Sequence, residues 1–129
     1  MFQFFRNIKH FVKNLWDFRK QLWDFRRYDY GCNLKFLNRS LELTAEYMRS
    51  DDAMMDRSIE SAGQIDIYLA LMNEHEKSIE VAEKELGLSV FSDDREDVRK
   101  ISACASEIEE DRWNRAFDYL KNNMRNWWD

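Results

Sequence analysis

The sequence has 129 residues, of which 44% are hydrophobic and 35% charged, and it contains no proline and only three glycines. This composition is typical of one folded domain and excludes a wholly disordered chain; it also disfavours an all-β fold, which needs frequent turns. The isolated Gly31, Gly63 and Gly87 exclude a glycine-rich phosphate loop.

The net charge of −5 is unevenly distributed: residues 1–30 carry seven basic and three acidic side chains, whereas residues 31–129 carry thirteen basic and twenty-two acidic ones. Because the acidic part repels polyanions, we expect no nucleic-acid polymer as a partner.

The first 30 residues hold ten of the nineteen aromatic side chains and show the clearest helical periodicity. Apolar residues at alternating spacings of four and three form a seam, and a second seam lies one residue further on. The sequence LWDFR occurs at residues 15–19 and again at 22–26, a repeat of period seven. These features predict one long, basic, aromatic amphipathic helix over residues 1–30. The first seam consists of Phe4, Ile8, Phe11, Leu15, Phe18, Leu22 and Phe25, and the second of Phe5, Val12, Trp16, Arg19, Trp23 and Arg26.

The remaining residues, 31–129, predict an acidic helical body. Gly31 is expected to break the first helix in the left-handed conformation, and Gly87 is expected to close a later one. Between and beyond these glycines, apolar residues recur at helical spacing in three stretches. We therefore expect an all-α fold of four to five helices, a helical bundle in a single domain over residues 1–129. The three stretches are residues 34–48, 55–86 and 98–127.

Catalytic and metal-binding residues are sparse. His10 and His75 have no partner ligands at metal-binding spacing, and Cys32 and Cys104 form no CxxC pair, so we expect no metal and no cofactor. One enzyme class is a remote alternative: all-α nucleoside-triphosphate pyrophosphohydrolases hold Mg²⁺ with acidic pairs on neighbouring helices. Acidic residues are frequent enough here to produce the same spacing by chance. The pairs are Glu80 with Glu83, and Glu107 with Glu110, which Asp111 follows.

Aromatic and basic side chains alternate at the end of the first predicted helix. Flat rings stack on a nucleobase, and arginine guanidinium groups bind phosphate or carboxylate in a bidentate manner. The same residues at helical spacing also suit a helix core whose arginines pair with acidic neighbours. Both interpretations stay open. The candidate ligand-binding residues are Trp23, Arg26, Arg27, Tyr30 and Arg39.

The two seams also predict an interface, because one is expected to cover the protomer's own core and the other to meet a second copy. We therefore expect a homo-oligomer. Near residue 129, Trp127 is expected to dock on the apolar stripe of the last helix, and Trp128 to point about 100° away. A basic amphipathic segment over residues 1–27 also suits the surface of an anionic membrane, but a helix–helix interface is the favoured interpretation of its apolar side. The interface candidates are Phe5, Val12, Trp16, Arg19, Trp127 and Trp128.

The order W-x-F-R, L-W-x-F-R-x-x-D-Y and, after a short gap, L-x-x-L-x-R-S-L-E covers residues 16–42, and residues 123–129 read NMRNWWD. This pattern resembles small uncharacterised helical proteins of tailed bacteriophages. The resemblance implies a phage accessory protein of the host cytoplasm, with a role in host takeover or counter-defence. Together with the residues above, it favours a non-enzymatic protein that binds and sequesters a small anionic, nucleotide-type ligand. The alternative is an interaction or inhibitor module that occludes a host or phage protein.

Overall fold

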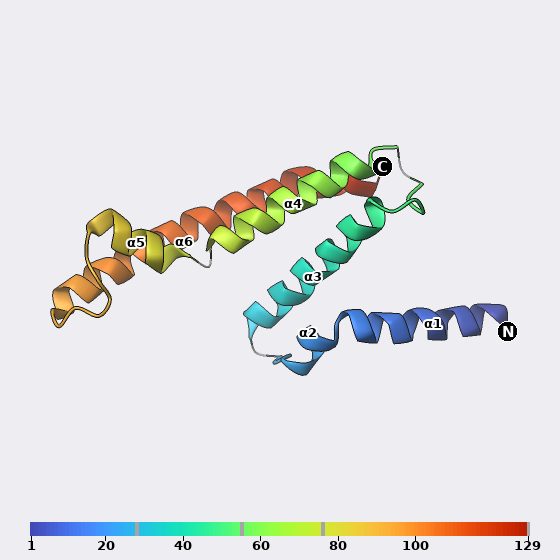
Figure 1. Ribbon diagram of the computed structural model, residues 1–129, viewed down its shortest axis with the longest axis horizontal. Coiled ribbons are helices and arrows are strands. Elements are labelled where there is room, and N and C mark those ends of the chain that lie inside the picture. Colours follow the sequence, from blue (N-terminus) through green and yellow to red (C-terminus); the bar gives the residue numbers. More distant parts are fainter. Residues whose placement is uncertain (28, 55, 76, 129) are drawn as a thin grey trace. The chain divides into compact units, whose positions relative to one another are not determined.

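The computed structural model describes residues 1–27, 29–54, 56–75 and 77–128, apart from the side chain of His75 (Figure 1). These described residues form six α-helices and one 3₁₀-helix and contain no β-strand, which confirms the all-α prediction. The number of helices exceeds the expected four to five because two of the predicted helices are each interrupted. The chain divides into two compact units, Met1–Thr44 (unit 1) and Ala45–Asp129 (unit 2). The single domain over residues 1–129 stays a prediction.

Unit 1 consists of α1 (Phe2–Asp17), α2 (Arg19–Trp23) and most of α3 (Tyr30–Met48), whose last residues belong to unit 2. The expected helix over residues 1–30 is therefore interrupted at Phe18, where φ is −102° and ψ is 10°. The backbone N–H of Phe18 still donates to the carbonyl oxygens of Asn14 and Trp16. The chain thus turns out of α1 without leaving this amide unsatisfied, and a five-residue helix follows.

The LWDFR repeat lies at two helix ends rather than along one helix, which corrects the prediction. In the first copy, Asp17 is the last residue of α1. In the second copy, Trp23 is the last residue of α2 and Asp24 is its C-terminal cap. The repeat therefore marks two places where the helical backbone stops.

Phe18 and Phe25, both expected in the first seam, pack instead on Phe36 of α3. The Phe18 and Phe36 ring centroids are 5.7 Å apart and stacked, and those of Phe25 and Phe36 are 5.4 Å apart and edge-on. At the start of α3 the Asp29 carboxylate accepts a hydrogen bond from the Gly31 backbone N–H at 2.8 Å, as a helix N-cap does. Gly31 is therefore helical, and its expected left-handed conformation is wrong, because the cap at Asp29 begins the helix before it.

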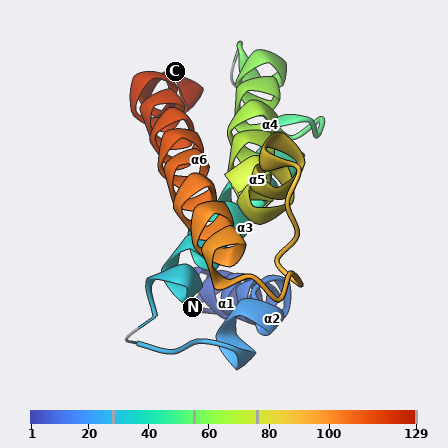
Figure 2. The same ribbon diagram turned by 90° about the vertical axis from the view of Figure 1, so that its left-hand side faces the viewer.

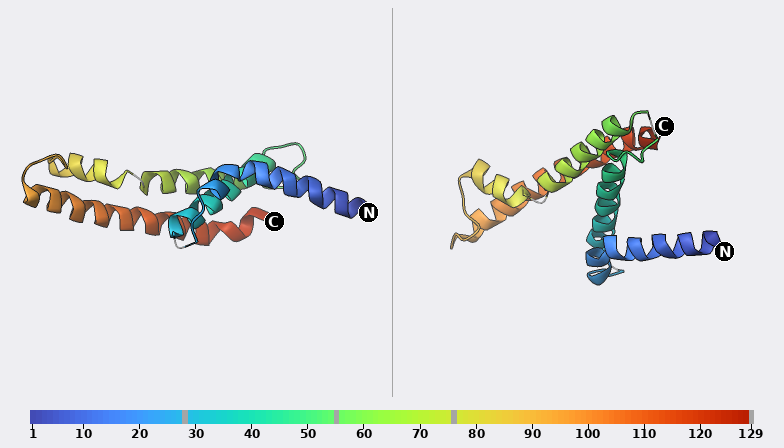
Figure 3. Two further views of the ribbon diagram at one scale, coloured as in Figure 1. Left: turned by 90° about the horizontal axis from the view of Figure 1, so that it is seen from below. Right: turned by 45° about the vertical axis from the view of Figure 1, so that its right-hand side comes forward.

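Unit 2 contains α4 (Ser58–His75), α5 (Ser78–Leu86), α6 (Arg95–Asn123) and a 3₁₀-helix, η1 (Met124–Trp128). Helices α4 and α5 follow one another along α6, which runs antiparallel to both (Figures 2 and 3). The stretch predicted over residues 55–86 is thus two helices, and its first residue, Met55, lies outside the described residues. Gly87 closes α5 in the left-handed conformation with φ of 65°, as predicted.

The core of unit 2 lies between these helices. Ala82 of α5 packs against Ile101 and Ala105 of α6, and further fully buried side chains line the contact between α4 and α6. Trp127 is completely buried, and its indole Nε1 donates to the amide Oε1 of Gln64 at 2.8 Å. The 3₁₀-helix is therefore fastened to α4 as well as to α6. The other buried hydrophobic side chains among the described residues of unit 2 are Ala45, Met48, Ala62, Ile65, Tyr68, Met72, Ala116 and Leu120.

Candidate functional site

From Phe4 onward, helix α1 separates its apolar and polar side chains onto two sides, yet none of its residues is buried. At 100° per residue, seven apolar side chains fall within one sector of roughly 140°. Each of these side chains is between 43% and 67% exposed. We call this sector the α1 apolar face, and it consists of Phe4, Phe5, Ile8, Phe11, Val12, Leu15 and Trp16.

The expectation that one seam of this segment covers the protomer's own core is wrong for α1. Both seams are exposed along its whole length, because no other helix of unit 1 lies beside it beyond its end (Figures 1 and 3). The interface candidates Phe5, Val12 and Trp16 are 59% to 67% exposed and belong to this uncovered surface. An apolar area of this size on a water-exposed helix is typical of a binding surface.

The polar side of α1 is basic. It carries Arg6, Lys9 and Lys13, and the first acidic residue of the chain is Asp17, at the end of the helix. On the helical wheel these three cations fall within roughly 60° of one another and border the apolar face beside Phe5. The opposite border is formed by uncharged side chains, which are Gln3, Asn7 and Asn14.

Arg19 lies just beyond this face and is held by Trp16. Its guanidinium carbon lies 4.2 Å from the centre of the Trp16 ring, and its Nη1 donates to the Trp16 carbonyl oxygen at 2.7 Å. The cation therefore covers part of the indole and satisfies a carbonyl at the end of α1. Arg19 was expected at an interface, and the contacts that its guanidinium makes here are with Trp16 of the same protomer.

The five ligand candidates all lie in unit 1, and two of their guanidinium groups have structural bonds. Arg39 donates from Nε to the Asp17 carbonyl oxygen at 3.2 Å and from Nη1 to Glu42 at 2.9 Å, so it ties α3 to the end of α1. Arg26 donates to the carbonyl oxygen of Phe25 at 3.0 Å. The remaining candidates, Trp23, Arg27 and Tyr30, are exposed, and Trp23 reaches 86%.

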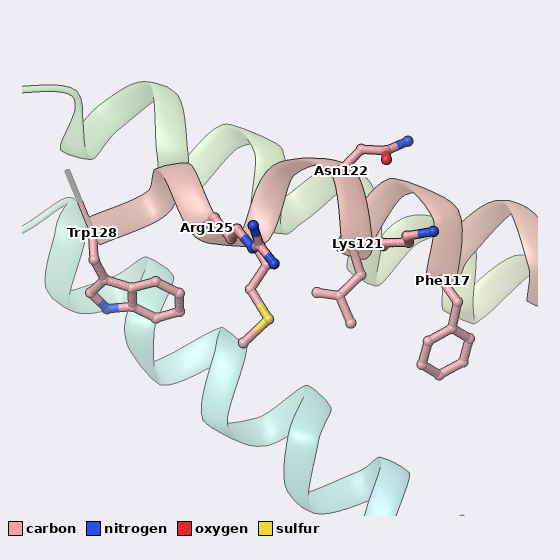
Figure 4. Close-up of a pocket in the computed structure, with 7 residues that line it drawn as sticks. Phe117, Lys121, Asn122, Arg125 and Trp128 are labelled. Carbon is pink, nitrogen blue, oxygen red and sulfur yellow. The ribbon is translucent and has the colours of Figure 1, made fainter.

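Unit 2 carries a groove of about 730 Å³ along the end of α6 and η1. Trp128, which is half-exposed, and Phe117 project on this side, and Lys121 and Arg125 belong to its lining (Figure 4). Trp127 lies in the core and is not available as an interface residue, whereas the interface stays a prediction for Trp128. The complete lining is Phe117, Leu120, Lys121, Asn122, Met124, Arg125 and Trp128.

The acidic pairs do not converge on a metal site in the part of the chain that the structure describes, where no group of three or more metal-ligating side chains occurs. Glu83 instead accepts a hydrogen bond from the Val90 backbone N–H at 2.8 Å. Partial burial, with Glu85 and Glu107 nearby, raises the pKa of the Cys104 thiol. A raised pKa keeps this thiol protonated and makes it a poor nucleophile.

Sequence reasoning missed two structural features of unit 1. The contacts of Phe18 and Phe25 with Phe36 lie at and beyond the interruption at Phe18, and apolar periodicity gave no sign of that interruption. The bond from Arg39 to the backbone carbonyl oxygen of Asp17 was also missed, because a backbone acceptor leaves no signal in the residue type. No protein-family model matches the sequence, and neither a curated protein nor a solved structure resembles this chain significantly.

Proposed function

We propose that this chain is a non-enzymatic interaction protein that works through the α1 apolar face. The observation that carries the proposal is an amphipathic helix of 16 residues with no buried residue. Isolated helices of this length are only marginally stable in water, and most helical stability in proteins comes from packing of an apolar face. A partner that covers the face would supply this packing.

The biological setting is part of the proposal and is based on the phage-like sequence pattern. A phage accessory protein of the host cytoplasm would use such a face to engage a component of the host or a second copy of itself. In a homo-oligomer, the helices of several protomers would complete the helical bundle that the sequence predicts. Unit 2, which has a closed core, would then serve as the folded body of the protein.

Capture of a small anionic ligand is the second candidate function, favoured by the exposed indole of Trp23 and the net charge of +5 on unit 1. A panel of cyclic and linear nucleotides tests it, with the melting temperature of the protein and the mass of the nucleotide as readouts. Binding would raise the melting temperature, and Arg27→Ala would abolish the increase. Loss of intact nucleotide would favour the pyrophosphohydrolase alternative instead.

Fractionation of a host-cell lysate that contains the tagged full chain tests the main proposal. The wild-type chain should be found with its partner, in a fraction of larger complexes or of membranes, and not in the fraction of free monomers. The double variant Phe4→Ser/Phe11→Ser removes two aromatic rings from the face and should remain free. Serine has nearly the helix propensity of phenylalanine, so helix formation is little affected.

The matched control is Asn7→Ser/Asn14→Ser on the uncharged border of α1, which should fractionate as the wild type does. Identical fractionation of the wild type and the phenylalanine double variant would overturn the proposal. A shift of the asparagine control with the phenylalanine variant would do the same, because the effect would not be specific to the face.

A further inference from the structure

We infer that the partner of the α1 apolar face is an anionic lipid surface, on which α1 lies parallel to the membrane plane. This inference rests on the proposed function, since it names the partner of the same face. The structure shows a helix with equal numbers of apolar and polar residues, which are separated from Phe4 onward, and with cations on the polar side. This combination is typical of helices that bind in the membrane interface.

The width of the apolar face favours a plane over a single helix. A partner helix in a coiled coil covers the seam of Phe4, Ile8, Phe11 and Leu15. It would leave Phe5, Val12 and Trp16 at the edge of the contact, although they are as exposed as the seam. A lipid surface covers the whole sector of roughly 140° at once.

The charge of α1 favours anionic lipid over a second α1. Residues 1–16 contain Arg6, Lys9 and Lys13 and no acidic residue. Two copies of α1 side by side would bring these like charges together, whereas anionic head groups attract them. Because the cations border the apolar face, their long aliphatic stems can lie along the lipid while the charges reach the head groups.

The end of α1 carries an aromatic side chain suited to the same boundary. Trp16 lies at the edge of the apolar sector, and the Arg19 guanidinium lies over its ring at 4.2 Å. Tryptophan is enriched at membrane–water boundaries, because its ring is apolar and its N–H is polar. The pair would therefore place an indole and a cation together at head-group level.

The geometry requires binding on the membrane rather than across it. No helix in the described part of the chain is long and apolar enough to cross a bilayer. With 16 residues, α1 is about 24 Å long, and one side of it is basic. Unit 2 carries twenty-one acidic and eleven basic residues, so the same surface would repel it and restrict contact to unit 1.

Flotation of the purified full chain with vesicles tests the inference. The chain should float with vesicles of equal parts phosphatidylcholine and phosphatidylglycerol, and added salt should weaken this binding. Phosphatidylcholine alone should bind much less. Lys9→Gln/Lys13→Gln should lower the partition coefficient roughly 25-fold, about 5-fold for each cation. Phe4→Ser/Phe11→Ser should lower it at least about tenfold, and Asn7→Ser/Asn14→Ser should leave it unchanged.

Two results separate this inference from the proposed function. If the chain does not float with anionic vesicles, while the phenylalanine variant still loses its partner in lysate, the lipid inference is wrong and the interaction function stands. Light scattering then shows whether the partner is a second copy, from a mass that falls to the monomer in the variant. If neither experiment responds to the phenylalanine variant, both proposals fail.

Discussion

The two units use their apolar residues in opposite ways. Unit 1 holds eleven of the nineteen aromatic residues, but its buried hydrophobic side chains among the described residues are only Cys32 and Leu41. Unit 2 has fewer aromatic residues and a core of alanine, isoleucine, methionine, Tyr68 and Trp127. Aromatic content therefore does not locate the core of this protein, and the exposed rings of unit 1 are the basis of the proposed interaction function.

Trp127 and Trp128 are neighbours in unit 2 but should contribute very differently to its stability. Trp127→Ala should lower the free energy of unfolding by about 3–5 kcal/mol, because it empties a fully buried site in unit 2 and removes the bond to Gln64. Trp128→Ala should cost less than about 1 kcal/mol, since that ring is half-exposed. Urea unfolding followed by far-ultraviolet circular dichroism measures both, and equal costs would contradict the placement of Trp127 in the core.

The second effect depends on pH and also lies in unit 2. Burial raises the pKa of Tyr68 from 10.0 to about 12, which means that the folded state holds its proton longer than the unfolded state does. The resulting stabilisation is complete below pH 10 and is lost as pH rises from 10 to 12, by about 2–3 kcal/mol in total. Burial also raises the pKa of Tyr119, which contributes in the same direction.

Tyr68→Phe isolates this contribution, since Tyr119 is present in both proteins. Unfolding free energies measured at intervals between pH 9 and 12 should fall less steeply in the variant. Parallel pH profiles would show that Tyr68 titrates normally and is not enclosed by the core.

Side chains of the α1 apolar face should contribute little to the stability of the isolated protein. Phe11→Ala removes a large aromatic side chain from α1, but without a bound partner it should change the free energy of unfolding by no more than about 0.5 kcal/mol. The reason is that Phe11 is 62% exposed and α1 has no buried residue. A loss of several kcal/mol in the isolated protein would mean that the apolar face is part of the core.

The sequence was sufficient for those elements whose signals are local. Helix α6 and the helix predicted over residues 34–48, which is α3, follow from apolar residues at helical spacing. Gly87 ends α5 because glycine readily adopts the left-handed conformation that is common at a helix C-terminus. The all-α class follows from the same periodicity together with the absence of proline. Such features depend only on residues that are close in the sequence, so a single sequence is enough to predict them.

The division of the first helix and the role of its aromatic residues were not predictable in this way. Apolar periodicity continues through Phe18, although the backbone leaves the helix there to let Phe18 and Phe25 reach Phe36. Likewise, the same apolar seam is expected in a helix whose face is buried and in one whose face is exposed, so the sequence alone does not predict the exposure of α1. Arg39 was a good ligand candidate by residue type, but a bond to Asp17, 22 residues earlier, gives it a structural role.

The bond between Trp127 and Gln64 also sets an order of events during synthesis. The two residues are 63 positions apart, so α4 leaves the ribosome long before the side chain that covers Gln64 has been made. Until then the part of α4 around Gln64 is uncovered, and an uncovered apolar surface is vulnerable to aggregation and proteolysis. A contact of such high sequence separation forms late and slowly compared with local helical turns. Completion of unit 2 therefore follows the emergence of Trp127 from the ribosome, whereas the contacts of unit 1 around Phe36 can form while the rest of the chain is still being translated.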